Sequence, residues 1–213
     1  MKFKGAVLQN REALSDIKNM LSHQNGPCVV VVSALKGIMP RLRQLYALSV
    51  HQGCGFEEEF QELRNIHEQL ACELLSGEKL QEYKKELKIQ LDDLYQILYH
   101  VAVLKESPQG MKDYILSKGD LLASLLFSKL FTDACWKDSR HFIFTDNDFG
   151  APEVLWEESC EAVKREFKNL KGIAVVPGYC GKTRIGYTIS LGRVGLSLTA
   201  AVIEAAFKQA VAV

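Results

Sequence analysis

The run of four valines from Val29 to Val32 constrains the fold of this 213-residue chain more than any other feature. It lies within a continuous apolar stretch, Cys28 to Ala34, in which polar and apolar residues do not alternate. β-Branched residues favour strands, and a strand without alternation is typically buried on both faces. Strands of that kind belong to parallel sheets covered by helices, so the run predicts an α/β layered fold.

The residues on either side of the valines extend this pattern. Residues 2–8 are predicted to form a first strand, and the spacing of Leu14, Ile17 and Leu21 predicts an amphipathic helix between the two strands. Residues 35–40 are expected to form a turn at the carboxyl end of the valine strand.

A long helical pattern occupies the middle of the chain, over residues 56–104. Apolar residues recur there every three or four positions on both sides of a break at Ser76-Gly77, which predicts two long amphipathic helices joined by a short turn. They are Phe56, Phe60, Leu63, Ile66, Leu70 and Leu74 before the break, and Leu80, Tyr83, Leu87, Leu91, Leu94, Leu98 and Val101 after it. We favour a hairpin packed on the sheet over an exposed partner-binding arm, because a globular helix must bury such a stripe.

The second half of the chain again alternates between helices and strands. We expect a helix through residues 114–126, a strand and a polar loop within 136–150, a helix over 152–170 and a short strand over 172–176. A last helix, rich in small residues, is expected over 197–212.

Composition and charge exclude several classes of function. The chain has 26 Lys and Arg and 26 Asp and Glu residues, so no basic excess is present to hold a nucleic-acid backbone. No apolar run reaches the length of a membrane-spanning helix, and the first residues lack the apolar core of a signal peptide, so we expect a cytoplasmic protein. The cysteines form no C-x-x-C pair and the histidines show no metal-ligand spacing, which favours reduced thiols and no metal site.

Glycines are concentrated near the end of the chain, where Gly192 and Gly195 precede the last predicted helix. Backbone N–H groups in such a loop at the amino end of a helix can bind an anion. The same glycines can instead form tight turns, and from this pattern alone we favour turns.

Several segments taken together resemble the aspartokinases, which are members of the amino-acid kinase superfamily. The segments are residues 2–5 (KFKG), 31–38 (VVSALKGI), 117–126 (SKGDLLASLL) and 192–200 (GRVGLSLTA), with further likeness over 145–151 and 175–179. The resemblance implies a three-layer α/β sandwich with a mainly parallel sheet, as a single domain over 1–213 with the helical hairpin inserted at about 56–104. It also implies an enzyme of amino-acid biosynthesis that phosphorylates the side-chain carboxylate of L-aspartate with ATP.

The resemblance assigns three residues to the amino-acid substrate. The family's S-H-G-E pattern implies that Asp120 holds the substrate's amino group, and its G-R-G-G-S-D pattern implies that Arg193 clamps a substrate carboxylate, which a guanidinium can do with two parallel hydrogen bonds. Ser33 would line the same pocket.

A second set of residues is assigned to the phosphates. The family's K-F-G-G-T-S pattern implies that Lys2 reaches the transferred phosphate as a catalytic residue. Gly5, Gly37 and Gly195 would form loops whose backbone approaches phosphate. Lys4 and Lys36 stand where the family has small residues, and we expect them to point to solvent, with occlusion of the γ-phosphate position or attraction of a free anion as alternatives.

The chain departs from the family's patterns at several ligand-facing positions. Ala6 and Val7 replace two hydroxyl residues, Asp120 is one methylene shorter than the family's Glu, and Ser197 stands where the family has Asp. Phosphoryl transfer depends on positioning and electrostatic stabilisation by such groups, so we expect kinase activity to be weak or lost. In the family, the segment beyond the helix that follows Arg193 supplies most of the nucleotide-binding lobe.

Three functions are therefore compatible with the sequence. The chain is the amino-terminal part of a larger aspartokinase-like polypeptide, or a non-catalytic pseudokinase that binds an amino acid or a protein partner, or a kinase whose nucleotide lobe comes from another chain. MgATP is expected as a ligand if the protein is active, with an aspartate-like amino acid as the small-molecule partner. The expected protein partner is a second copy of the chain in a homodimer, or further carboxyl-terminal domains, and we expect neither nucleic acid nor membrane as a partner.

Overall fold

The computed structural model describes residues 1–3, 11–23, 26–52, 55–105 and 107–211. Within them, a central sheet has the strand order β1-β2-β5-β3, and every neighbouring pair is parallel. The strands are β1 (Lys2–Phe3), β2 (Cys28–Val32), β5 (Ile173–Pro177) and β3 (Ala134–Trp136). The valine run forms β2, which lies between two other strands, as its apolar sequence predicts.

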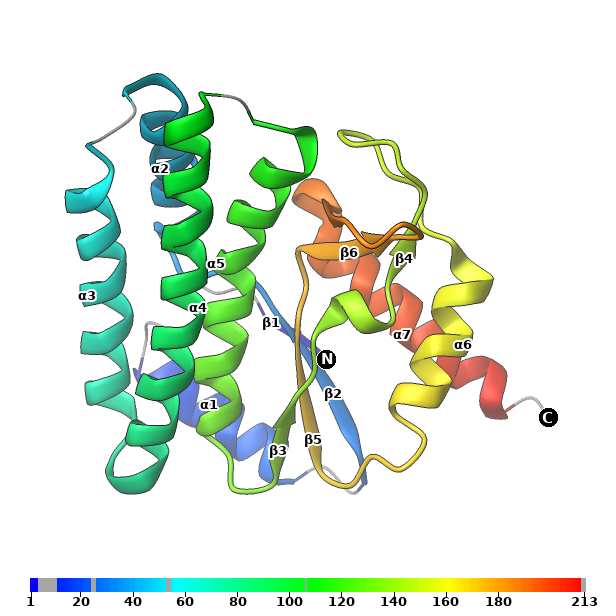
Figure 1. Ribbon diagram of the computed structural model, residues 1–213. Coiled ribbons are helices and arrows are strands. Elements are labelled where there is room, and N and C mark those ends of the chain that lie inside the picture. Colours follow the sequence, from blue (N-terminus) through cyan, green and yellow to red (C-terminus); the bar gives the residue numbers. More distant parts are fainter. Residues whose placement is uncertain (4–10, 24–25, 53–54, 106, 212–213) are drawn as a thin grey trace.

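Alternate residues of the two middle strands point into two different cores. Val30 and Val175 belong to one core, and Val31 and Val176 belong to the other. The first core is covered by α5 (Gln109–Lys129), and the second by α6 (Trp156–Glu166) and α7 (Gly195–Val211). Figure 1 shows these helices on opposite sides of the sheet. The chain is therefore a three-layer α/β sandwich with a mainly parallel central sheet.

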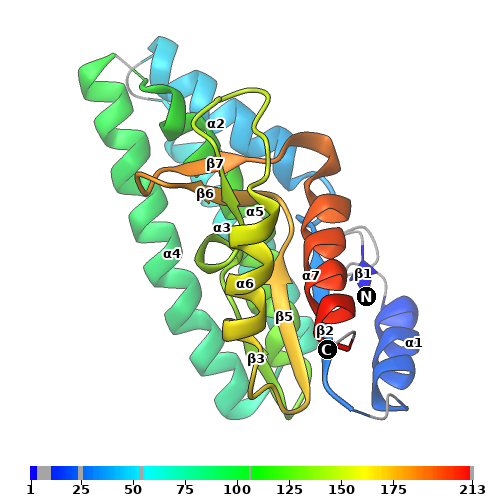
Figure 2. The same cartoon turned by 90° about the vertical axis from the view of Figure 1, so that its right-hand side faces the viewer.

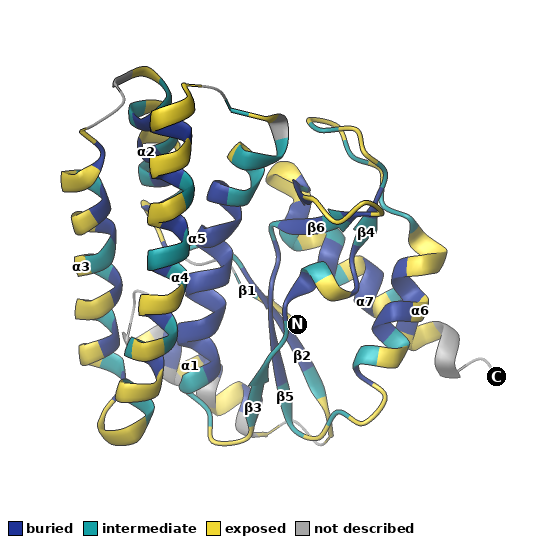
Figure 3. Cartoon of the chain, in the orientation of Figure 1, coloured by how far each residue is buried: buried dark blue, intermediate teal, exposed yellow. Residues whose placement is uncertain are grey.

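The helical hairpin consists of α3 (Glu57–Leu74) and α4 (Gly77–Leu104). It packs on α2 (Ile38–Gln52) and α5, and not directly on the sheet as expected. The reason is that residues 115–128 of α5 are all buried, so this helix fills the space between the sheet and the hairpin. Figure 3 shows most of α5 in the colour of buried residues, whereas α3 and α4 each keep an exposed face.

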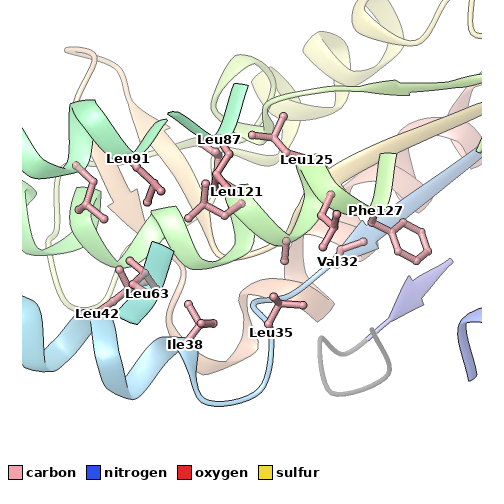
Figure 4. Close-up of a cluster of buried hydrophobic side chains, with 14 of the residues drawn as sticks. Val32, Leu35, Ile38, Leu42, Leu63, Leu87, Leu91, Leu121, Leu125 and Phe127 are labelled. Atoms are coloured by element: carbon pink, nitrogen blue, oxygen red, sulfur yellow. The ribbon is translucent and has the colours of Figure 1, made fainter. Parts of the chain in front are cut away.

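The apolar stripes of the hairpin meet a continuous core. Leu63 of α3 and Leu87 and Leu91 of α4 lie beside Leu42 of α2 and Leu121 of α5 (Figure 4). Each of these side chains is at most 2% exposed. The stripe that predicted the hairpin is thus used for packing within the chain.

Two parts of the fold differ from the sequence-based expectations. Helix α2 begins at Ile38, inside the predicted turn, and Pro40 lies in its first turn, where a missing N–H costs no hydrogen bond. A second, three-stranded sheet has the order β4-β6-β7 and consists of β4 (Phe144–Thr145), β6 (Cys180–Thr183) and β7 (Thr188–Ser190). It lies above the central sheet in Figure 2.

The remaining elements complete the connections. They are α1 (Arg11–Ser22) and the short 3-10 helices η2 (Ser139–His141) and η3 (Gly192–Val194). No helix in the described part of the chain is long and apolar enough to cross a lipid bilayer. The connections that follow β2 and β5 leave the carboxyl edge of the central sheet, which is where open α/β sheets bind their ligands.

Candidate functional site

A cavity of about 310 Å³ lies at this carboxyl edge. Ser33 and Ala34 reach it directly after β2, and Tyr179 reaches it after β5. The other lining residues are Met39 and Arg43 of α2, Asp120 of α5, Gly192 and Arg193 of η3, and Leu196 of α7. The fold thus brings Ser33, Asp120 and Arg193, which are far apart in the sequence, to one cavity.

Asp120 forms part of the cavity wall and is only 3% exposed. The Ala34 N–H donates to Asp120 Oδ1 at 2.8 Å. The N–H groups of Gly178 and Tyr179 also favour the charged carboxylate, although the Gly178 N–H donates to the Val32 carbonyl oxygen at 3.0 Å. Burial raises the pKa of Asp120 to about 7, and the backbone N–H groups offset part of that effect. The hydrogen bond from Ala34 therefore connects α5 to the segment that follows β2.

Gly119 allows α5 to approach that segment. A Cβ at this position would lie 2.9 Å from Met39 Sδ and 3.0 Å from the Ala34 Cβ, so a larger residue would require these side chains to shift. The glycine therefore supports the close packing in which Asp120 reaches the Ala34 N–H.

Two arginines face the cavity from different elements. Arg193 is the residue that the sequence predicts to bind a carboxylate, whereas Arg43 was not predicted. Both are exposed, and neither forms an ion pair with a described residue. Met39 and Arg43 are four residues apart, which places them on the same face of a helix. This spacing could have indicated that Arg43 lines the cavity, but only if residues 38–43 had been predicted to be helical.

Lys2 lies outside this cavity. Its Nζ donates to Ser197 Oγ at 3.1 Å, and both residues line a neighbouring groove of about 820 Å³ between α7 and strands β1 and β2. Leu196 lines the cavity and the next residue, Ser197, lines the groove, so the two sites are adjacent along α7. Lys2 therefore contacts the residue that stands where aspartokinases have Asp.

The predicted phosphate-loop glycines have different environments. Gly37 is exposed with a φ of +84° just before α2, and it does not line the cavity. Gly195 is buried, and a Cβ there would lie 2.8 Å from the Gly178 carbonyl oxygen, so it sets the close approach of α7 to the segment after β5. Gly5, like Lys4, lies outside the described residues, and Lys36 is exposed.

Lys118, the neighbour of Gly119, points away from the cavity into a polar network between α4 and α5. Its Nζ lies 2.6 Å from Asp93 Oδ2 and 2.7 Å from Gln90 Oε1, and the Tyr114 hydroxyl donates to the same Asp93 oxygen at 2.6 Å. Burial lowers the pKa of Lys118, and the hydrogen bond to Asp93 opposes that effect. The network holds the hairpin to α5, a role that the sequence did not indicate.

Known proteins resemble this chain in sequence. No family model matches the chain. Aspartokinase 2 of Arabidopsis thaliana, a chloroplastic protein, is 28% identical over 214 residues, which cover 95% of this chain and 39% of the relative. The chain therefore spans about two-fifths of the length of that curated relative.

Solved structures show the same fold. The crystal structure of Escherichia coli aspartokinase III in complex with lysine and aspartate has a TM-score of 0.84 at 23% identity, covering 97% of this chain and 46% of that one. The crystal structure of the same enzyme in complex with aspartate and ADP has a TM-score of 0.82, also at 23% identity and the same coverage. This chain therefore has the amino-acid kinase fold and is aspartokinase-like along nearly all of its length.

Proposed function

We propose that this chain is an aspartokinase-like domain whose cavity binds the amino-acid substrate, L-aspartate. One observation carries the proposal: Ser33, Asp120 and Arg193, assigned to the substrate from three separate segments, line one cavity at the carboxyl edge of the sheet. The similarity to aspartokinases, whose E. coli member binds aspartate in a solved structure, supports the same ligand here.

The chemistry of the cavity suits an amino acid with two carboxylates. The guanidinium of Arg193 is available to clamp one carboxylate, because no described residue forms an ion pair with it. Asp120 carries the opposite charge at the cavity wall, where the resemblance places the substrate's amino group. The second carboxylate of the ligand would be the phosphoryl acceptor.

Phosphoryl transfer requires an electrostatic environment that this chain supplies only in part. The Lys2 ammonium would neutralise charge that develops on the transferred phosphate, and it lies beside Ser197 in the groove next to the cavity. Ser197 offers a hydroxyl where the family has a carboxylate. We therefore propose that phosphorylation of aspartate with MgATP is slow or absent in this chain.

Magnesium would be held mainly by the phosphates of the nucleotide. Among the described residues, no group of three His, Cys, Asp or Glu side chains could hold a metal ion. Mg²⁺ in phosphoryl-transfer enzymes usually binds through the substrate phosphates and one or two carboxylates, so a protein cage is not required. We further propose that a nucleotide-binding half, from further residues of the polypeptide or from another chain, completes an active enzyme.

Calorimetric titration tests the binding proposal. Purified protein is titrated with L-aspartate and, separately, with MgATP. We expect saturable aspartate binding that Arg193→Ala abolishes, and no MgATP binding by this chain alone. Failure of aspartate to bind refutes the proposed substrate site. Saturable MgATP binding by this chain alone refutes the proposal that a separate half supplies the nucleotide-binding site.

The second candidate is a pseudokinase that binds the amino acid without phosphorylating it, and the replacement of the family's Asp by Ser197 favours it. A coupled assay for ADP formation with L-aspartate separates the two. Robust ADP formation establishes a kinase. Because this chain alone is expected not to bind MgATP, the pseudokinase is established only by aspartate binding with background ADP formation when the nucleotide-binding half is also present. Ser197→Asp restores the family's carboxylate beside Lys2 and should raise the rate if the nucleotide binds.

A further inference from the structure

Arg193 lies on a short exposed turn that side-chain packing does not hold in place. The turn is η3, Gly192–Val194, and none of its residues is buried. Gly192 has a φ of +67°, and Val194 is 62% exposed. An exposed segment of this kind moves easily unless hydrogen bonds fix it. The direction in which the Arg193 guanidinium points therefore depends on the hydrogen bonds at the start of the turn.

Those hydrogen bonds lead from the turn to helix α5. The Gly192 N–H donates to Ser190 Oγ at 3.0 Å, and the Ser190 N–H donates to Asp113 Oδ2 at 2.8 Å. The Leu191 N–H, between them, donates to the Tyr179 carbonyl oxygen at 2.8 Å. Asp113 is half-buried, and a carboxylate is a stronger acceptor than a neutral oxygen. Two consecutive hydrogen bonds thus join Asp113 to the first residue of η3.

Asp113 and Asp120 act on two sides of the cavity from one face of α5. They are seven residues apart in the sequence, which is about two helical turns, so both side chains leave the helix on the same side. Asp120 accepts the Ala34 N–H after β2, and Asp113 accepts the Ser190 N–H at the end of β7. Ala34 and Arg193 both line the cavity, whereas Asp113 is not among its described lining residues. Helix α5 therefore connects two walls of the cavity.

We propose that Asp113 is a positioning residue for Arg193: through Ser190, it holds η3 in the orientation that binds the ligand. The proposal rests on the proposed function, because it requires that Arg193 clamps a carboxylate of the amino acid. A guanidinium forms two parallel hydrogen bonds with a carboxylate only when the two groups are aligned, so a small displacement of the turn weakens binding.

Two substitutions at Asp113 test the effect on binding, by calorimetric titration with L-aspartate. Asp113→Ala removes the acceptor, and we expect it to weaken binding at least about fivefold, because a small misplacement of a binding group is costly. Asp113→Asn keeps an oxygen that can accept the Ser190 N–H, so it should bind within about twofold of the unaltered protein.

The matched control is Asp146→Ala. Asp146 is also half-buried, and its Oδ1 accepts the Asp148 N–H at 3.2 Å and the Glu153 N–H at 3.1 Å. It lies between β4 and α6 and does not line the cavity. The control removes the same kind of hydrogen bond without touching η3, so it should bind L-aspartate like the unaltered protein.

NMR of the unliganded protein separates placement of the turn from a general loss of stability. In Asp113→Ala, the Ser190 and Gly192 amides should exchange faster with solvent, and the heteronuclear NOE of residues 192–194 should fall. The Ala34 amide, which donates to Asp120 on the other wall, should keep its protection. A merely structural role of Asp113 would instead lower protection throughout α5 and the central sheet, Ala34 included.

Ser190→Ala tests the same connection if Asp113→Ala does not fold. It keeps the N–H that donates to Asp113 but lacks the hydroxyl that accepts the Gly192 N–H. We expect the same fall of the NOE over residues 192–194 and weaker binding of L-aspartate.

The outcomes separate the two proposals. Unchanged affinity in the substituted proteins refutes the positioning role, and so does an unchanged NOE over residues 192–194. Loss of protection at Ala34 together with Ser190 refutes it as well, because Asp113 then holds the fold as a whole. These results leave the proposed substrate site intact. If the unaltered protein does not bind L-aspartate, the proposed function is refuted, and the positioning role with it.

Discussion

The buried carboxylate of Asp120 should make the stability of this protein depend on pH in a direction opposite to that of most aspartates. Burial raises its pKa from an ordinary 3.8 to about 7 in the folded protein. The folded state therefore holds a proton between these two pH values that the unfolded state has already released. A raised acid pKa contributes stability that is fully present below about pH 4 and is lost as the pH rises towards 7.

The magnitude follows from the separation of the two pKa values. A difference of about three pH units, at about 1.36 kcal/mol per unit, corresponds to a total of about 4 kcal/mol. Between pH 4.5 and 7.5 the change amounts to about 3 kcal/mol, because part of the titration lies outside this range. Asp120→Asn removes the titrating group while preserving the size of the side chain.

Urea unfolding of both proteins at several pH values in this range measures the effect. The free energy of unfolding of the unaltered protein, minus that of Asp120→Asn, should fall by about 3 kcal/mol as the pH rises. Other titrating groups cancel in the difference. Glu204→Gln serves as a control of opposite sign, because the hydrogen bond from Lys208 lowers the pKa of the exposed Glu204. A difference for Asp120→Asn that stays constant from pH 4.5 to 7.5 would refute the reasoning.

Three further predictions concern packing and the buried lysine. Leu91 of α4 is 1% exposed, and Leu91→Ala should lower the free energy of unfolding by about 2–5 kcal/mol in denaturant titrations. Ile89→Ala, on the exposed face of the same helix, should change it by less than about 0.5 kcal/mol. Equal effects of the two substitutions would contradict the packing described. Lys118→Met should lower the same quantity by about 1–3 kcal/mol, because the charged hydrogen bond to Asp93 is lost, and unchanged stability would contradict this. Gly195→Ala should push α7 away from the cavity and weaken L-aspartate binding in calorimetry, and an unaltered affinity would show that the close approach is unimportant.

The layered fold could be predicted because its signals are local and repeated. The valine run identifies a middle strand of a parallel sheet, and the three- and four-residue spacings identify the hairpin. The start of α2 was missed because Pro40 was interpreted as part of a turn. The small sheet was missed because β6 contains Gly181, and a glycine inside a strand weakens the strand pattern. The fold requires this glycine, since a Cβ at position 181 would lie 2.7 Å from the Ile143 carbonyl oxygen.

The candidate site could be predicted only where a motif carries it. Arg193 and Asp120 come from short patterns shared with aspartokinases, and the fold places them at one cavity. That Arg43 also lines the cavity depends on the position of α2, which no motif reveals. The hydrogen bond from the Ala34 N–H to Asp120 is also invisible in the sequence, because it depends on the distance between α5 and the segment after β2.

The most direct test of the account is a titration of ¹⁵N-labelled protein with L-aspartate, followed by backbone amide chemical shifts. The account predicts saturable shifts concentrated at the residues that line the cavity, such as Ala34, Tyr179 and Leu196, and their loss in Arg193→Ala. Absence of saturable shifts, or shifts confined to the groove that contains Lys2, would contradict the central claim that this cavity binds the amino acid.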